Sequence, residues 1–146
     1  MKNIVLIPAM GCDGRLYSAL SQALSPLRRI SIAIADRDNL KDCVAQVLAD
    51  APEQFIVLGT SFGGRVALEL ALGHANRVEG LVVIGAGAGA AADPTLGLKR
   101  AARLRGSEFE TVVTEMADMV SHMPGPNGPA TLELFVEMAR DNGCAM

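Results

Sequence analysis

The sequence predicts an α/β protein: an open, mostly parallel sheet of about four strands with flanking helices, followed by a helical segment. Two observations carry this prediction. Over residues 1–90, apolar runs of strand length alternate with stretches of helical periodicity, which is typical of parallel strands joined by helices. Beyond residue 93, only helical periodicity remains. We therefore expect one domain, with an α/β core over 1–92 and a helical segment over 93–146.

The composition favours a compact intracellular protein. The chain has 146 residues, half of them apolar and only 20% charged, which excludes a disordered or coiled-coil protein. A net charge of −3 gives no electrostatic basis for binding nucleic acid or anionic membranes. No apolar run approaches the ~18 residues that a membrane helix needs, or resembles a signal peptide. Three cysteines without paired spacing favour reduced thiols over disulfides or zinc ligands, so we expect a cytoplasmic protein without cofactor or metal.

The first three strands are predicted from apolar runs at residues 3–7, 30–34 and 55–58. Two helices are indicated between them by apolar residues at helical spacing, and they are closed by Pro26 and Pro52. The residues of these two stripes are Leu16, Leu20, Ala23 and Leu24, and then Leu40, Cys43, Val44, Val47 and Leu48.

The later elements follow the same logic. A helix after the third strand reaches about Leu72, and a fourth strand covers residues 81–84. Residues 85–92 alternate Gly with Ala and are predicted as a loop. Two further helices are separated by a segment rich in Pro and Gly at 124–129. Their apolar stripes are Phe109, Val112, Val113, Met116 and Val120, and then Leu132, Phe135, Val136 and Ala139.

The most specific motif is the G-x-S-x-G of residues 59–63, placed directly between a strand and an amphipathic helix. A nucleophile at such an elbow has a strained backbone, so the residues two before and two after it must be nearly free of side chain, as Gly59 and Gly63 are. The following helix N-terminus favours negative charge. Ser61 is thus the predicted nucleophile, and the N–H of Phe62 a predicted oxyanion donor. Alternatively, the glycines only let a helix pack near the sheet, with Ser61 as its N-cap.

A second oxyanion donor is expected from the loop after the first strand, because acyl-transfer enzymes hold the oxyanion with two N–H groups. That loop covers residues 8–14, and Met10 is the candidate donor. The alternative interpretation is an ordinary turn in which Asp13 caps the next helix.

These motifs resemble the α/β-hydrolase superfamily, in particular its small serine esterases. Residues 7–17 are similar to the family's opening, with Ala9 in place of the usual Gly and Tyr17 in place of Trp. Residues 77–84 resemble the strand after the elbow helix, and the helices beyond resemble the family's lid, so the likeness covers essentially the whole chain. The resemblance implies a helical lid over 93–146 and hydrolysis of a small-molecule carboxylic ester through an acyl-enzyme on Ser61.

The family's triad order is Ser, then Asp or Glu, then His, on loops after the last core strands, and no position here matches that acid or that base. His122, at the end of a lid-like helix, is a candidate base, although a solvated helix-end histidine is the simpler interpretation. Asp93, shortly after the fourth strand, is a candidate acid. His74 is expected to be structural, because it lies about a dozen residues of helix from Ser61 at ~1.5 Å per residue.

Two alternatives to an active enzyme stay open: a truncated, catalytically silent hydrolase fragment, and a non-enzymatic binding domain that reuses the fold. A dinucleotide site is not favoured. Residues 85–90 match G-x-G-x-x-A, but Asp93 and Pro94 delay the helix that a pyrophosphate needs.

If the fourth strand is a sheet edge, its apolar residues invite pairing with another chain, so a homodimer through that edge or the lid helices is expected.

Overall fold

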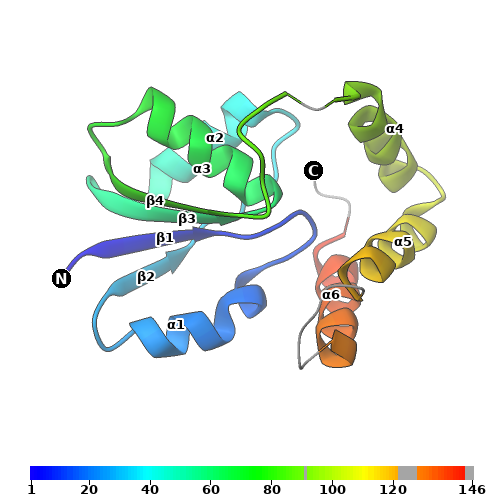
Figure 1. Cartoon of the computed structure of the whole chain (residues 1–146), viewed down its shortest axis with the longest axis horizontal. Helices are drawn as coiled ribbons and strands as arrows, with labels where there is room; N and C mark the ends of the chain where they lie inside the picture. Colours follow the sequence, from blue (N-terminus) through cyan, green and yellow to red (C-terminus); the bar gives the residue numbers. More distant parts are fainter. Residues whose placement is uncertain (91, 122–127, 144–146) are drawn as a thin grey trace. The chain divides into compact units, whose positions relative to one another are not determined.

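The computed structural model describes residues 1–90, 92–121 and 128–143. The chain divides into two compact units, Met1–Ala88 and Gly89–Cys144. Figure 1 follows the chain through both units. Among the described helices, none is long and apolar enough to cross a membrane.

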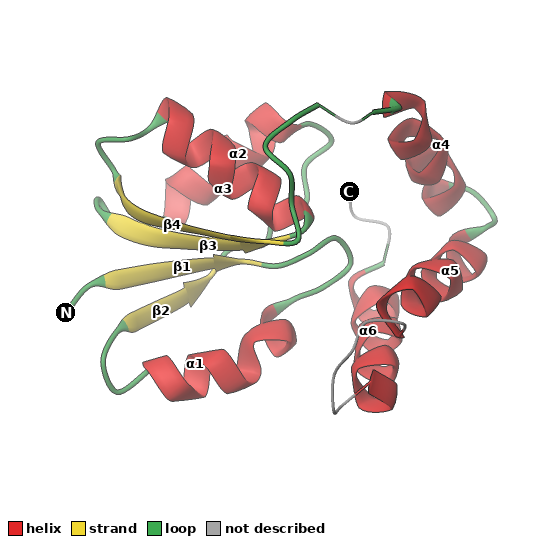
Figure 2. Cartoon of the chain, in the orientation of Figure 1, coloured by secondary structure: helices red, strands yellow, loops and turns green. Residues whose placement is uncertain are grey.

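The first unit contains a four-stranded sheet in the order β2-β1-β3-β4, with every neighbouring pair parallel. Helix α1 lies on one face of this sheet, and α2 and α3 lie on the other (Figure 2). The predicted α/β class is therefore confirmed. The strands are β1 (Asn3–Ile7), β2 (Arg29–Ile32), β3 (Phe55–Thr60) and β4 (Val78–Ile84), and the helices are the 3₁₀ turn η1 (Gly14–Tyr17), α1 (Ser18–Leu24), α2 (Leu40–Asp50) and α3 (Phe62–Gly73).

Both faces of the sheet bury apolar side chains, which explains why β1 is a continuous apolar run. Val5 and Ile7 point into the core shared with α2 and α3, and alternate residues Ile4 and Leu6 point into the core on the opposite face, which includes Tyr17. Side chains in β1 are 8% exposed or less from Ile4 onward. The ends of β1 and β3, where the candidate site begins, are thus fixed by packing on two sides.

Three strands differ in their bounds from the predicted ones. Strand β3 continues to Thr60, two residues beyond the predicted end at residue 58. Strand β2 pairs with β1 only over Arg29–Ile32, although the N–H of Ala33 still donates to the carbonyl of Leu6 at 2.9 Å. Strand β4 begins at Val78 rather than at residue 81. Its first residues include Glu79 and Gly80, which apolar periodicity does not recognise as strand, and backbone pairing with β3 extends it to that point.

The second unit is helical, with α4 (Pro94–Arg105), α5 (Phe109–Ser121) and α6 (Gly128–Asn142) (Figure 2). Residues of the predicted stripes in α5 and α6 are buried, namely Val112, Val113, Phe135 and Ala139. Ion pairs join the helices: Arg103 binds Glu115 at 2.8 Å, and Arg140 binds Glu110 at 2.9 Å. Helix α4 was not among the predicted helices, because it buries none of its residues and so has no apolar stripe to detect.

Candidate active site

The backbone at Ser61 has the strained conformation expected of a nucleophile elbow. Ser61 lies between β3 and α3 with φ 54° and ψ −115°, and it is the only non-Gly residue with positive φ among the described residues. It occupies the N-cap position of α3, yet its side chain makes no capping hydrogen bond. The exposed hydroxyl is therefore not used as a helix cap, which favours the elbow over the N-cap interpretation.

The glycines on either side of Ser61 are required by close backbone contacts. A Cβ added at Gly59 would lie 2.1 Å from the carbonyl oxygen of Gly63, and one added at Gly63 would lie 2.1 Å from that of Ile7. Gly64 is nearly as confined, since a Cβ there would meet the Cβ of Ala86 at 2.8 Å. Each clash involves atoms that cannot rotate away, so the spacing of the motif follows from sterics.

Backbone hydrogen bonds hold the elbow from both sides. The N–H of Ser61 donates to the carbonyl of Ile84, the last residue of β4, at 2.7 Å. The carbonyl of Ser61 accepts from Gly64 at 2.9 Å and from Arg65 at 3.2 Å, which starts the helix. The serine is thus placed by the neighbouring strand and by the first turn of α3.

The two predicted oxyanion donors lie at the ends of β3 and β1. Phe62 is the first residue of α3, where a backbone N–H has no acceptor within the helix. After β1, Cys12 donates its N–H to the carbonyl of Ala9 at 3.0 Å, and Gly11 has φ 73°, a combination typical of a type II turn. Met10 is the second residue of this turn, whose hydrogen bond does not use its N–H.

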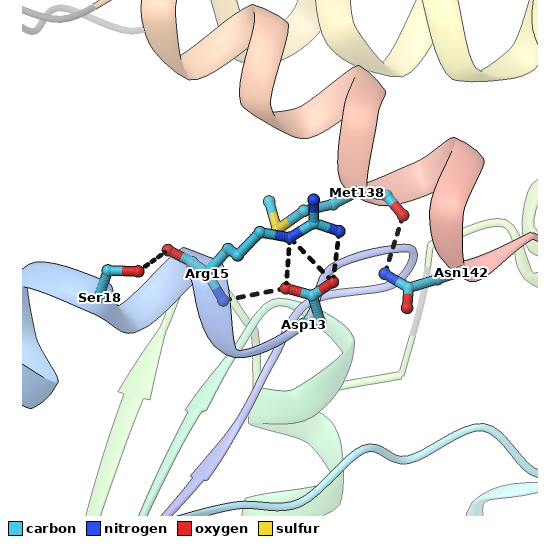
Figure 3. Close-up of polar contacts among 5 residues, drawn as sticks. All are labelled: Asp13, Arg15, Ser18, Met138 and Asn142. Atoms are coloured by element: carbon cyan, nitrogen blue, oxygen red, sulfur yellow. Dashed lines mark hydrogen bonds and ion pairs between the residues drawn. The ribbon is translucent and has the colours of Figure 1, made fainter.

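Asp13 has the capping role offered as the alternative for this loop. Its carboxylate accepts the backbone N–H of Arg15 at 2.9 Å and caps η1. The same carboxylate binds the Arg15 guanidinium through Nη2 at 2.7 Å and Nε at 3.0 Å, as Figure 3 shows. This cap fixes the end of the loop and leaves the proposed role of Met10 untouched.

Two buried ionisable side chains, one within the loop and one shortly after it, remain neutral near pH 7. Burial, with a smaller contribution from Asp13, raises the pKa of the Cys12 thiol to about 11, so Cys12 is not a competing nucleophile. Burial also raises the pKa of Tyr17 above its usual value. The Tyr17 hydroxyl contacts the carbonyl of Ile7 and the hydroxyl of Thr60. Sequence reasoning noted Tyr17 only as a replacement for Trp and missed both contacts.

The candidate acid and bases are placed as follows. Asp93 caps α4 in the second unit, accepting the N–H of Thr95 at 2.9 Å and its hydroxyl at 2.6 Å, and these bonds lower the pKa of this exposed carboxyl. His122 lies outside the described residues. His74 is the C-cap of α3, at the opposite end of the helix from Ser61, as expected. In the described part of the chain, no group of three or more His, Cys, Asp or Glu residues is suited to hold a metal ion.

Comparison with solved structures decides the fold. The enol-lactonase from Burkholderia xenovorans superposes with a TM-score of 0.77 at 18% identity, covering 99% of this chain and 61% of the lactonase. A hydrolase from Pseudomonas aeruginosa gives a TM-score of 0.69 at 19% identity, covering 94% of this chain and 58% of that one. The chain has a partial α/β-hydrolase fold. No family model matches the sequence.

Two known sequences that are similar to this chain have the same activity in their names. Pimeloyl-[acyl-carrier protein] methyl ester esterase of Vibrio campbellii is 30% identical over 91 residues, which is 56% of this chain and 36% of the esterase. The esterase of the same name from Aliivibrio salmonicida is 33% identical over 94 residues, 56% of this chain and 35% of the esterase. The match thus spans about a third of the length of these relatives.

Proposed function

We propose that this α/β-hydrolase chain is a serine hydrolase that acts on carboxylic esters, with Ser61 as the nucleophile. The observation that carries the proposal is the backbone of Ser61, held at φ 54° between glycines that admit no side chain, with its hydroxyl exposed and unused by the helix. Strain of this kind costs ~1–3 kcal/mol and persists where function requires it. The similar sequences named as methyl ester esterases support the same class of substrate.

The mechanism proposed for these residues is acyl transfer in two steps. The Ser61 Oγ attacks the ester carbonyl carbon, and the carbonyl electron pair moves onto its oxygen, which accepts hydrogen bonds from the N–H groups of Phe62 and Met10. The general base takes the proton of the Ser61 hydroxyl during the attack and gives it to the leaving oxygen, so collapse of this tetrahedral intermediate expels the alcohol and leaves an acyl-Ser61. Water then attacks the acyl carbon, and the carboxylic acid leaves as the Ser61 hydroxyl is restored.

His122 as the general base and Asp93 as its acid complete the proposal. A positioned base contributes ~10²–10⁴-fold to such a step, whereas an oxyanion hole with binding alone gives ~10³–10⁴-fold over water. Changing His122 to Asn should therefore lower kcat by about 100-fold or more, and Asp93→Asn should lower it less. An unchanged kcat in either variant would remove that residue from the mechanism.

The nucleophile is tested by covalent labelling. The purified protein is treated with a fluorophosphonate probe and assayed with short-chain p-nitrophenyl esters, beside Ser61→Ala and the exposed-serine control Ser25→Ala. We expect stoichiometric labelling and turnover in the wild type and in Ser25→Ala, and neither in Ser61→Ala. If the wild type shows neither signal, the enzyme proposal fails, and a catalytically silent hydrolase fragment or a binding domain is the better interpretation.

A homodimer in the cytoplasm is the remaining part of the proposal. Strand β4 is an edge of the described sheet, and its side chains Leu81, Val82 and Ile84 are 39%, 43% and 47% exposed. Pairing of two such edges would bury this apolar surface. Light scattering at several concentrations should give twice the monomer mass for the wild type and the monomer mass for Val82→Lys, and a wild-type monomer at all concentrations would contradict the dimer.

A further inference from the structure

One buried hydroxyl connects the two strand ends that carry the candidate oxyanion donors. The ring of Tyr17 packs with Ile4, Leu6 and Leu58 on the α1 face of the sheet, and the side chain is 5% exposed. Its hydroxyl donates to the carbonyl of Ile7 at 2.8 Å and lies 2.7 Å from the Thr60 Oγ1. We call these three residues, Tyr17, Ile7 and Thr60, the hydroxyl junction.

Each partner of Tyr17 supports one half of the candidate site. Ile7 ends β1 and precedes the loop that contains Met10, and its carbonyl also lies against Gly63, where an added Cβ would be 2.1 Å away. Thr60 ends β3 and directly precedes Ser61. In the sheet, Ile7 pairs with Gly59, so the two strand ends are adjacent, and the Tyr17 hydroxyl joins them from one face.

The hydrogen bonds in the junction have a single consistent direction. Tyr17 has one hydroxyl proton, and a backbone carbonyl can only accept. The Tyr17 proton is therefore donated to the Ile7 carbonyl, and the Thr60 hydroxyl donates to the Tyr17 oxygen. The order requires a neutral tyrosine, which is the form that burial of Tyr17 favours.

We propose that Tyr17 is a positioning residue that sets the distance between the Met10 and Phe62 N–H groups by joining the ends of β1 and β3 through its hydroxyl. The inference rests on the proposed function. Tyr17 does not touch the reacting atoms. Because the oxyanion develops only in the transition state, misplaced donors weaken kcat and leave substrate binding unchanged. A side chain that served only the core would affect stability instead.

The kinetic test removes the hydroxyl and keeps the ring. In Tyr17→Phe we expect kcat for a p-nitrophenyl ester to fall about 10–100-fold, with KM changed less than about 2-fold. Thr60→Val should behave similarly, the double variant should be no worse than either single variant by more than about 2-fold, and Thr60→Ser should recover wild-type kcat. Ser25→Ala, which loses an exposed hydroxyl bonded to the carbonyl of Gln22, is the matched control and should match the wild type.

A second measurement does not depend on activity. Amide hydrogen exchange of Tyr17→Phe should accelerate in residues 8–12 and 60–64 and stay at the wild-type rate in α2. Unchanged kcat with a lowered melting temperature, or unchanged exchange in those two segments, would overturn the proposal. A wild type that neither turns over ester nor labels with fluorophosphonate would sink the proposed function alone, and the exchange pattern would still decide whether Tyr17 positions the two segments.

Discussion

Strands β3 and β4 are neighbours in one sheet, and each ends in a glycine-rich segment with a positive φ, at Ser61 (54°) and at Gly85 (65°). The two segments differ in what surrounds them. At Gly59 and Gly63 an added Cβ would lie 2.1 Å from backbone oxygen, whereas at Gly85 and Gly87 it would meet nothing within 4 Å. Glycines are thus required by contact around Ser61. After β4, the positive φ of Gly85 favours glycine, but no contact requires one at Gly85 or Gly87.

This difference explains why the G-x-S-x-G motif after β3 indicates a candidate site and the G-x-G-x-x-A pattern after β4 does not. After β3, the helix α3 starts at once and its first residues sit against the end of β1. After β4, no helix begins among the described residues before Pro94, so the G-x-G-x-x-A pattern of residues 85–90 has no helix N-terminus next to it, as the sequence predicted. In this chain, the glycine pattern at the candidate site is the one where packing leaves no room for a side chain.

The largest expected effect comes from filling the space at Gly63. Gly63→Ala should lose more than ~3 kcal/mol of unfolding free energy or fail to accumulate as folded protein, because the new methyl group meets the backbone oxygens of Ile7 and Pro8. Urea unfolding followed by circular dichroism measures this. A variant as stable as the wild type would contradict the steric requirement.

A matched pair of valines compares the two strands directly. Val57 in β3 is 0% exposed and Val82 in β4 is 43% exposed. Val57→Ala should cost about 1.5–3 kcal/mol of unfolding free energy, and Val82→Ala less than about 1 kcal/mol, because less apolar area is lost from the core. The midpoints of urea unfolding at low protein concentration provide the comparison, and equal losses would mean that β4 is covered in solution.

Relieving the strain at the elbow should stabilise the protein. Ser61→Gly should raise the unfolding free energy by about 1 kcal/mol, the strain of a positive φ less the entropy that glycine loses on folding. Ser61→Ala keeps a Cβ and should leave stability unchanged while removing the same hydroxyl. Calorimetry of the two variants separates strain from chemistry; a stabilised Ser61→Ala would show that the hydroxyl, not the backbone, carries the cost.

The smallest effect is expected in the open segment after β4. Gly87→Ala should raise the unfolding free energy by about 0.4–1 kcal/mol, because Gly87 has neither a positive φ nor a neighbour in the way of a methyl group, and alanine restricts the unfolded chain. Thermal unfolding would detect this gain. If the variant loses more than ~1 kcal/mol of unfolding free energy, the segment after β4 is as intolerant of a side chain as the one around Ser61, and the contrast between the two segments is wrong.

Much of the fold could be predicted because the signals are local. The apolar runs of β1 and β3 and the glycines around Ser61 follow from burial on two faces and from one tight turn. Helix α4 could not be predicted from periodicity, since Leu96 and Leu98 are 62% and 72% exposed. Its start follows instead from the Asp93 cap and a proline at the first position.

The geometry of the candidate site could be predicted only in part, for a related reason. Ser61 and Phe62 belong to one continuous motif, so spacing was enough to select them. The contact between Tyr17 and Thr60 joins residues 43 positions apart, and it depends on which strands are neighbours and which face each side chain takes. A local sequence pattern does not reveal which strands are neighbours in the sheet, or which side chains from distant segments lie on the same face of it.

The hydrogen bond from the Ser61 N–H to the Ile84 carbonyl makes the outermost strand part of the support of the serine. Ile84 is 47% exposed, and edge strands fray more readily than interior ones. Fraying of β4 would therefore disturb the backbone of Ser61, the proposed nucleophile, through this one hydrogen bond. A polypeptide that pairs with the exposed edge of β4 would therefore stabilise the backbone of the proposed nucleophile without contacting a substrate bound at Ser61.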